Sequence, residues 1–294
     1  MLGFRWLLLT LLVPTFVYAD EVKIYNWEEY FSPEVLSQFE KKTGHTVTQT
    51  YFDNEHLRDD VIASERGKVY DLILVDSLSL HYMSQKGLMH NFSQEAIPNR
   101  IHFSSKAVQA CGKTGVPYTW GTMGIAYRTS QFSRPVDSWL DLFQPEQKHV
   151  GKITMPLDDV DTVGAALLAL KLNPFSDNPE ELKQAYQLLS SVKPKMKSFR
   201  NTLSYAMEHR ESSDLDIALA YSGESYLLNE VTGADDWQYV APKEGTLLWY
   251  ECFAAVSSRP LSNATLAFLN FINDPKIAAK NGKVSGQQRL INQL

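Results

Sequence analysis

The N-terminal part of the chain alternates strand-like and helix-like segments, and this rhythm constrains the fold more than any other feature. Residues 22–27 (VKIYNW), 45–52 and 70–76 (YDLILVD) are rich in β-branched and aromatic residues, which is typical of strands. Residues 33–43 and 55–64, between them, have the pattern of helices. Because the strands are apolar on both faces, this βαβαβ order predicts an α/β fold with a parallel sheet covered by helices.

The rest of the chain mixes the same two kinds of element. We expect an extended segment over residues 115–127, helices over 163–172, 179–189 and 264–273, and strands over 217–221 and 249–256. At 294 residues one core is near its practical ceiling, so two lobes of roughly 100 to 150 residues are expected. No repeat or long polar linker separates them, which indicates chain crossovers. Because ligands of open α/β sheets bind at the carboxyl ends of strands, we expect the site in a cleft between the lobes.

Residues 1–19 have the pattern of a cleaved secretory signal. One basic residue, Arg5, precedes an apolar run over residues 6–17, and small Ala19 marks the cleavage point. The run is too short for a comfortable membrane span, and no cysteine follows Ala19 to carry a lipid. We therefore expect a protein secreted to the periplasm.

That compartment permits disulfides. Cys111 and Cys252 are the only two cysteines and thus the only possible intramolecular pair. The sequence does not show that they meet, and two separate buried thiols fit it as well.

The charge balance excludes some partners. The chain has 34 acidic residues against 28 Lys and Arg, a formal net charge of -6, and no basic run, which argues against a nucleic-acid binder. An acidic excess fits a cationic ligand, although solubility alone explains mild acidity in many proteins. The seven histidines show no HExxH or similar spacing, and no glycine-rich phosphate loop occurs. We expect neither a metal site nor a cofactor.

Carboxylates gather with aromatic residues or at element ends in four places. These are residues 26–30 (NWEEY), Asp76 with Ser77, residues 156–161 (PLDDVD) and residues 249–251 (WYE). Three of them lie at expected strand ends, which is where cleft residues come from. An indole face attracts an ammonium group by roughly 0.5 to 2 kcal/mol, and a carboxylate adds charge-assisted hydrogen bonds. The pattern therefore favours a primary amine or polyamine as ligand.

Each group also has an ordinary structural interpretation. Asp158 and Asp161 are three residues apart, so they face the same way on one helical turn, where either can also cap the helix. Trp249 and Glu251 project from the same face of a strand. A tryptophan taken alone more often packs in a core. Both interpretations stay open from the residues alone.

Six segments occur in a characteristic order: KIYNWEEYFSPEVLSQFEKKTG, YDLILVDSLSLHYM, PYTWGTMGIAYR, GKITMPLDD, DIALAYSGES and PKEGTLLWYE. This order resembles the periplasmic spermidine/putrescine-binding proteins of polyamine ABC transporters, from about residue 22 to the C-terminus. The resemblance implies a two-lobe periplasmic-binding-protein fold of type II, each lobe a mixed sheet flanked by helices. It also implies a polyamine held in the cleft without chemical conversion.

The resemblance further implies a set of ligand-binding residues. Glu251 with Trp249 would fix one ammonium end, Asp158 with Asp161 the other, and aromatic side chains would flank the ligand. The full set is Trp27, Glu28, Tyr30, Asp76, Asp158, Asp161, Tyr221, Trp249 and Glu251.

The chain also departs from the family pattern. Glu28 stands where a small hydroxyl residue is common, Asp76 where serine is usual, and Tyr221 where tryptophan is usual. Leu78 replaces an aromatic residue, and Gln287 falls near a position that is often tyrosine. The closing helices of the family are also not expected. Extra carboxylates with fewer aromatic residues imply a stronger demand for ligand charge than for methylene stacking.

We expect one lobe to comprise residues 20–126 and 250–294, and the other residues 127–249. The predicted function is that of a monomer that delivers a polyamine to the membrane permease of an ABC transporter. The alternative is a periplasmic polyamine sensor that reports to a membrane signalling protein of the cyclic-di-GMP type. Carboxylate pairs also serve glycosidases, but acids beside tryptophan suit a cation equally well, so an enzyme is not favoured.

Overall fold

The computed structural model describes residues 20–28, 30–93, 95–210, 214–258, 260–285 and 288–289. The predicted signal segment of residues 1–19, Glu29 of the first motif and Gln287 lie outside these residues. The strands are β1 (Glu21–Asn26), β2 (Thr46–Tyr51), β3 (Leu72–Asp76), β4 (Val116–Arg128), β5 (Ile153–Thr154), β6 (Ile217–Tyr221), β7 (Trp237–Val240), β8 (Leu248–Ala254) and β9 (Gln288–Arg289).

The α-helices are α1 (Pro33–Thr43), α2 (Glu55–Ala63), α3 (Ser77–Gln85), α4 (Ser105–Cys111), α5 (Trp139–Phe143), α6 (Asp159–Ala169), α7 (Pro179–Val192), α8 (Thr202–Glu208), α9 (Glu224–Thr232), α10 (Asn263–Ile272) and α11 (Pro275–Ser285). Short 3-10 helices are η1 (Glu65–Val69), η2 (Pro98–His102), η3 (Thr129–Gln131), η4 (Gln147–His149) and η5 (Lys193–Lys195).

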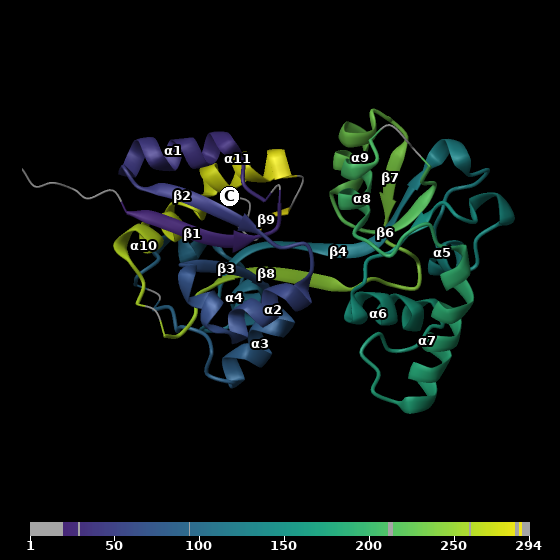
Figure 1. Cartoon of the computed structure of the whole chain (residues 1–294), viewed down its shortest axis with the longest axis horizontal. Coiled ribbons are helices and arrows are strands. Elements are labelled where there is room, and N and C mark those ends of the chain that lie inside the picture. The colour runs from purple at the N-terminus through teal and green to yellow at the C-terminus, as the bar shows by residue number, and fades with distance from the viewer. Residues whose placement is uncertain are drawn as a thin grey trace, which may run out of the picture.

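The first half of the molecule is built on the strand order β2-β1-β3-β8-β4. β1 runs parallel to both β2 and β3, which confirms the predicted βαβαβ unit. β8 then pairs antiparallel with β3, and β4 antiparallel with β8, so the sheet is mixed. We call this half the β1 body, and Figure 1 shows it on the left.

Both faces of this sheet are buried. In β3, Leu72 and Leu74 pack into a core with α1 and α10, while Ile73 and Val75 pack into a second core with α2 and α3. Figure 1 shows α1 and α11 above the sheet and α2 and α3 below it. The near-continuous apolar run of β3 follows from this double coverage.

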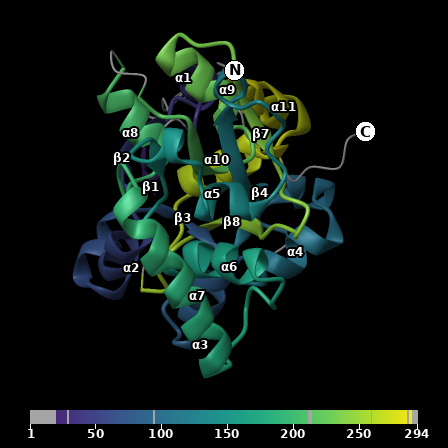
Figure 2. The same ribbon diagram turned by 90° about the vertical axis from the view of Figure 1, so that its right-hand side faces the viewer.

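The second half, which we call the β6 body, uses the C-terminal part of β4 with β5, β6 and β7. Met123, Ile125 and Tyr127 of β4 face a core with α5, α6 and α7, whereas Ala126 faces α8 and α9. Figure 2 views this half end-on, with α6 and α7 in front of the strands.

Two strands, β4 and β8, cross between the bodies (Figure 1). Along β4 the pairing passes from β8, up to Thr122, to β6, from Met123 onward. Leu247, just before β8, packs into the β6-body core, and Phe253 at its other end packs into the β1-body core. The predicted lobe limits at residues 126/127 and 249/250 fall along these two crossings, and they stay a prediction.

The structure corrects one predicted helix. The expected helix over residues 163–172 begins earlier and ends earlier, as α6 at Asp159–Ala169. Lys171 has a positive φ of 61°, a left-handed conformation that ends the helix although the apolar run continues to Leu172. Asp161 therefore lies inside the first helical turn and not ahead of the helix.

Candidate functional site

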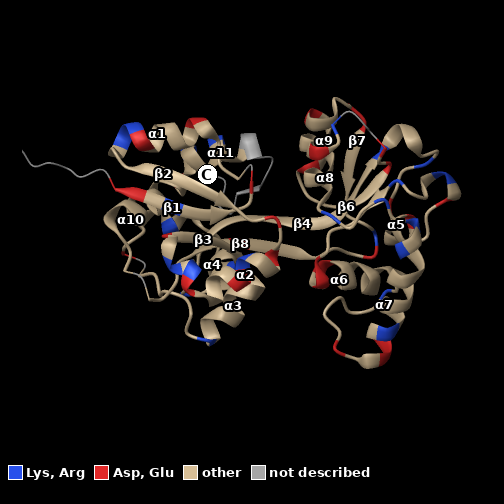
Figure 3. Ribbon diagram, viewed as in Figure 1, with Lys and Arg blue, Asp and Glu red and all other residues tan. Residues whose placement is uncertain are grey.

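The predicted ligand residues lie where elements of the two bodies meet. Trp27 directly follows β1, Asp76 ends β3, and Trp249 and Glu251 lie in β8. Opposite them, Asp158 precedes α6, Asp161 lies in its first turn and Tyr221 ends β6. Figure 3 shows acidic positions on the facing ends of α2 and α6.

Glu251 is the most buried carboxylate of the set, at 4% exposure. Its Oε1 accepts a hydrogen bond of 3.2 Å from the indole Nε1 of Trp27. Its Oε2 is buried and has no hydrogen-bond partner among the described residues. Burial raises the pKa of Glu251 to about 8, against the lowering effects of Arg58 and of the Trp27 hydrogen bond. This oxygen is an acceptor that the protein itself does not satisfy.

Asp76 is placed differently, although it lies opposite Glu251 in the register of β3 and β8. Its Oδ1 accepts the backbone N–H of Ser79 at 2.8 Å and so caps α3. Its Oδ2 accepts from Nη2 of Arg58, also at 2.8 Å. Both oxygens of Asp76 are thus already engaged by the protein.

Arg58 is the main residue of the site that sequence reasoning missed. Its side chain is fully buried and also contacts Asp59, through Nε at 2.8 Å, and Glu55, through Nη1 at 3.6 Å. Burial lowers the pKa of Arg58, but the surrounding carboxylates outweigh it and leave the pKa above its usual value. The only signal in the sequence was that Arg58 shares a helix face with buried Ile62, four residues on.

Glu55 was missed as well. Burial and the negative charge of Asp76 raise the pKa of Glu55 far above its usual range. The negative charge of Glu251 on β8 also helps to raise the pKa of Glu55 on α2, so these two carboxyl groups are electrostatically coupled. We call Glu55, Arg58, Asp59, Asp76 and Glu251 the β1-side cluster.

On the other side, Asp158 is the N-cap of α6, its Oδ1 accepting the backbone N–H of Asp161 at 2.7 Å. The hydroxyl of Tyr221 donates to Oδ2 of Asp161 at 2.6 Å. Burial, reinforced by the charge of Asp158, raises the pKa of Asp161 to about 7, although the Tyr221 hydrogen bond lowers it. The capping interpretation holds for Asp158, and Asp161 is brought beside Tyr221. We call Asp158, Asp161 and Tyr221 the α6-side group.

Trp249 of β8 contacts the α6-side group. Its ring meets that of Tyr221 edge to face, with centroids 6.2 Å apart. A Cβ placed on Gly121 of β4 would lie 2.3 Å from Cζ2 of Trp249, so the indole rests directly on this glycine. The buried Nε1 of Trp249 has no hydrogen-bond partner among the described residues.

The two sets lie within electrostatic reach of each other. Asp76 contributes to the raised pKa of Asp161, and Asp158 to that of Glu55. At the rim, Nε2 of His56 on α2 lies 3.8 Å from Oδ2 of Asp159 on α6. The structure therefore brings the predicted acids of both bodies into one region that is dominated by negative charge.

Glu28 and Tyr30 have different surroundings. Glu28 is exposed in the turn after β1. The ring of Tyr30 lies 6.2 Å from that of Tyr118, and its carbonyl accepts hydrogen bonds from Tyr118 and from Asn281. These contacts hold Tyr30 against the β1-body core, and a ligand role for both residues stays a prediction.

Comparison with known proteins places the chain in a family. The sequence profile of the family described as bacterial extracellular solute-binding protein matches residues 34–287. The chain belongs to that family. This solute-binding protein is 34% identical over 265 residues to a norspermidine sensor of Vibrio cholerae, covering 90% of this chain and 73% of the relative. It is 28% identical over 278 residues to the putrescine-binding periplasmic protein SpuD of Pseudomonas aeruginosa, covering 87% of this chain and 74% of that protein.

A solved structure shows the fold of this solute-binding protein. The Tp0655 lipoprotein of Treponema pallidum superposes with a TM-score of 0.79 at 20% identity, covering 92% of this chain and 87% of that chain. The two-lobe α/β fold of type II periplasmic-binding proteins, with mixed sheets flanked by helices, is thereby confirmed. None of the helices in the described part of the chain has the length and apolar character needed to cross a membrane.

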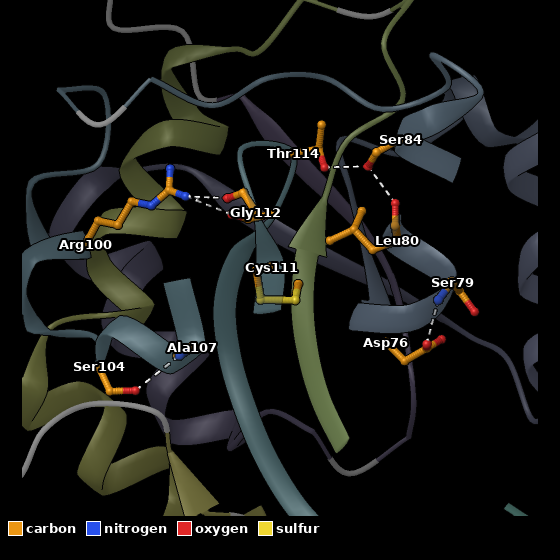
Figure 4. Close-up of a disulfide and its surroundings, with 12 residues drawn as sticks. Asp76, Ser79, Leu80, Ser84, Arg100, Ser104, Ala107, Cys111, Gly112 and Thr114 are labelled. Atoms are coloured by element: carbon orange, nitrogen blue, oxygen red, sulfur yellow. Dashed lines mark hydrogen bonds between the residues drawn. A yellow bond between two sulfur atoms is a disulfide. The ribbon is translucent and has the colours of Figure 1, made fainter. Parts of the chain in front are cut away.

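The fold of this solute-binding protein shows whether its two cysteines meet. Cys111 at the end of α4 and Cys252 of β8 form a disulfide, with Cα atoms 5.8 Å apart (Figure 4). Cys252 directly follows Glu251 in the chain, so the bridge fastens the strand that carries the buried carboxylate to α4. It lies entirely within the β1 body.

Two surface hollows lie near this disulfide and away from the acidic residues. One, of about 490 Å³, is lined by Phe92, Arg100, Val108, Gly112 and Lys113, and the other, of about 330 Å³, lies between α3 and α4. The described residues contain no group of three or more His, Cys, Asp or Glu side chains that could hold a metal ion. The candidate site of this solute-binding protein is therefore the acidic region between the bodies.

Proposed function

We propose that this protein captures a polyamine of the spermidine/putrescine class between its two lobes and delivers it to the membrane permease of an ABC transporter. The observation that carries the proposal is the buried Oε2 of Glu251, which has no hydrogen-bond partner among the described residues, in a carboxyl group whose other oxygen accepts from the indole of Trp27. An ammonium group donates to such an oxygen and stacks on an indole face.

The ligand contacts that we propose are the predicted ones. Glu251 and Trp249 bind one ammonium group, Asp158 and Asp161 bind the other end, and Trp27, Tyr30 and Tyr221 flank the chain of the ligand. Micromolar affinity requires about 8 kcal/mol, which is within reach of two or three desolvated ammonium–carboxylate pairs after the entropy of binding is subtracted. Glu28 and Asp76 add to the negative electrostatic potential of the site more than they contact the ligand directly.

The remaining properties follow from a binding role. The protein acts as a monomer in the periplasm after removal of residues 1–19, with lobes of residues 20–126 with 250–294 and of residues 127–249. It closes by rotation about β4 and β8, and closure presents the loaded form to the permease. It binds its ligand without converting it and has no nucleic-acid partner.

Calorimetry with putrescine, spermidine and norspermidine tests the proposal. Wild-type protein should bind at least one of them, and Glu251→Gln should weaken binding by about 10- to 100-fold, because a charged hydrogen bond in a buried site is worth about 1.5 to 3 kcal/mol. Glu230→Gln, on the exposed side of α9, is the matched control and should bind as the wild type does. The assignment fails if no polyamine gives heat, or if Glu251→Gln binds with unchanged affinity.

A second function is favoured by one observation, the 34% identity to a norspermidine sensor. In that case the same cleft binds a polyamine and the closed form reports to a membrane signalling protein of the cyclic-di-GMP type. A strain from which the gene is deleted distinguishes the two functions. Loss of polyamine uptake supports transport, whereas unchanged uptake with an altered cyclic-di-GMP level supports sensing.

A further inference from the structure

Arg58 brings a fixed positive charge into a site that otherwise attracts cations. Its side chain is fully buried, and its guanidinium lies 5.8 Å from the ring of Phe52. Phe52 in turn meets Trp27 at 4.4 Å between ring centroids, and Trp27 donates to Glu251. A continuous line of contacts thus joins Arg58 to the carboxylate that receives the ligand.

The carboxylates of the site fall into two classes: those that the guanidinium of Arg58 contacts and those that it does not. Asp76 has both oxygens engaged, one by Arg58 and one by the backbone of Ser79. Asp59 and Glu55 are the other partners of the guanidinium. By contrast, Oε2 of Glu251 has no partner among the described residues. No ion pair to Lys or Arg joins Asp158 or Asp161 in the described part of the chain.

We propose that Arg58 determines ligand specificity by acting as a built-in cation, which is hydrogen-bonded to Asp76 and limits the site to polyamines with at most three ammonium groups. This inference rests on the proposed function and names its substrate class. Glu251, Asp158 and Asp161 remain to accept ammonium groups. A fourth ammonium group would have to displace a buried guanidinium from Asp76, and it would meet the like charge of Arg58 on the way.

The test compares putrescine, spermidine and spermine as a diamine, a triamine and a tetraamine, by calorimetry on wild type and variants. Wild-type protein should bind spermine more weakly than spermidine. Arg58→Gln frees Asp76 and should raise the ratio of spermine to spermidine affinity at least tenfold. Arg66→Gln, an exposed arginine of η1, is the matched control and should leave the ratio unchanged.

Removal of a buried arginine can prevent folding, because it leaves carboxylates without a counter-charge. Arg58→Gln combined with Asp59→Asn removes one charge of each sign, keeps Asp76 free and should give the same gain for spermine. Arg58→Gln combined with Asp76→Ser removes the freed carboxylate and should cancel that gain.

The outcomes separate the two proposals. If wild-type protein binds none of the three polyamines, the proposed function fails. If it binds them but the folded variants keep the wild-type ratio, or if the wild type binds spermine more tightly than spermidine, the role of Arg58 is wrong while the polyamine function stands.

Discussion

The two sides of the site hold their carboxylates by different means. In the β1-side cluster, Arg58 lies among Asp59, Asp76 and Glu55 and supplies a permanent counter-charge. In the α6-side group, Asp158 accepts a backbone N–H and Asp161 accepts the hydroxyl of Tyr221, both from neutral donors. The first side thus contains a cation of the protein itself, whereas no Lys or Arg pairs with the carboxylates of the second side in the described part of the chain.

This difference indicates where a ligand contributes most. A buried carboxylate without a counter-charge raises the energy of the folded protein unless it is protonated or meets a cation. Asp161 is in that position, and Glu251 keeps an oxygen without a hydrogen-bond partner among the described residues although Arg58 acts on it electrostatically; burial raises the pKa of each, to about 7 and about 8. The binding energy of a cationic ligand should therefore come chiefly from these two residues and less from Asp76.

The largest expected loss of polyamine affinity comes from removing a carboxylate of the α6-side group. Asp161→Asn removes a carboxylate that has no internal cation, so polyamine affinity should fall by about 10- to 100-fold, the loss of one charged hydrogen bond in a buried place. Calorimetry with the ligand that the wild type binds best measures the change. Asp159→Asn, two residues earlier and 90% exposed, is the matched control and should lose less than about twofold.

Asp76→Asn is the corresponding change in the β1-side cluster. It leaves Arg58 with fewer carboxylate partners, so thermal stability should drop, whereas affinity should fall much less than in Asp161→Asn. If Asp76→Asn weakens binding more than Asp161→Asn does, the division into a side with an internal cation and a side without one is wrong.

The fold followed from the sequence wherever local pattern and tertiary contacts agree. The apolar run of residues 70–76 became β3, and Gly44, with φ of 75°, ends α1 where predicted. α6 differed because Lys171 takes a left-handed conformation that apolar periodicity does not record. Helices such as α3 and α8 were not predicted, since their apolar stripes are short and their burial depends on strands distant in the chain.

The site was predictable only in part, for a related reason. Trp27 and Glu251 were identified separately, but their hydrogen bond spans 224 positions, and no local pattern encodes such a pairing. Arg58 was missed because an arginine in a charged helix is usually solvated. Only the packing of α2 against β3 brings it to Asp76. The disulfide stayed open since spacing alone does not show that two cysteines meet.

A smaller effect on polyamine affinity is expected from a substitution in β4, one of the two strands that cross between the bodies. In Gly121→Ala the new methyl group would overlap the indole of Trp249 and the Oγ of Ser222, so the indole must shift. Loss of its contact with an ammonium group, worth about 0.5 to 2 kcal/mol, should weaken binding roughly two- to thirtyfold. Calorimetry checks the affinity and a thermal melt checks the stability.

Gly87→Ala is the control for backbone strain. Gly87 has φ of 71° and open space around it, so alanine should cost about 1 kcal/mol of stability without a change in affinity. Unchanged affinity in a folded Gly121→Ala protein would remove Trp249 from the ligand contacts.

The pH dependence of binding acts on both sides at once. Glu251 faces Arg58, Asp76 and Trp27, and Asp161 faces Asp158, Asp76 and Tyr221. With pKa values of about 8 and about 7, both carboxyl groups are largely protonated at pH 6 in the free protein and ionise as pH rises. Polyamine nitrogens resemble lysine, with a pKa near 10, and stay charged over this range. Because the ligand binds the ionised forms, affinity should rise by more than about tenfold between pH 6 and pH 8.

Stability of the ligand-free protein should move in the opposite direction. An acid whose pKa is raised by folding stabilises the folded state below its unfolded pKa, near 4, and this contribution is lost as pH rises through the folded value. The melting temperature without ligand should thus fall from about pH 5 to pH 8, and saturating polyamine should reverse the trend, because the bound cation favours the ionised acids. Glu251→Gln should flatten both profiles. Affinity that stays constant from pH 6 to pH 8 in the wild type would show that neither carboxyl group gains its charge on binding.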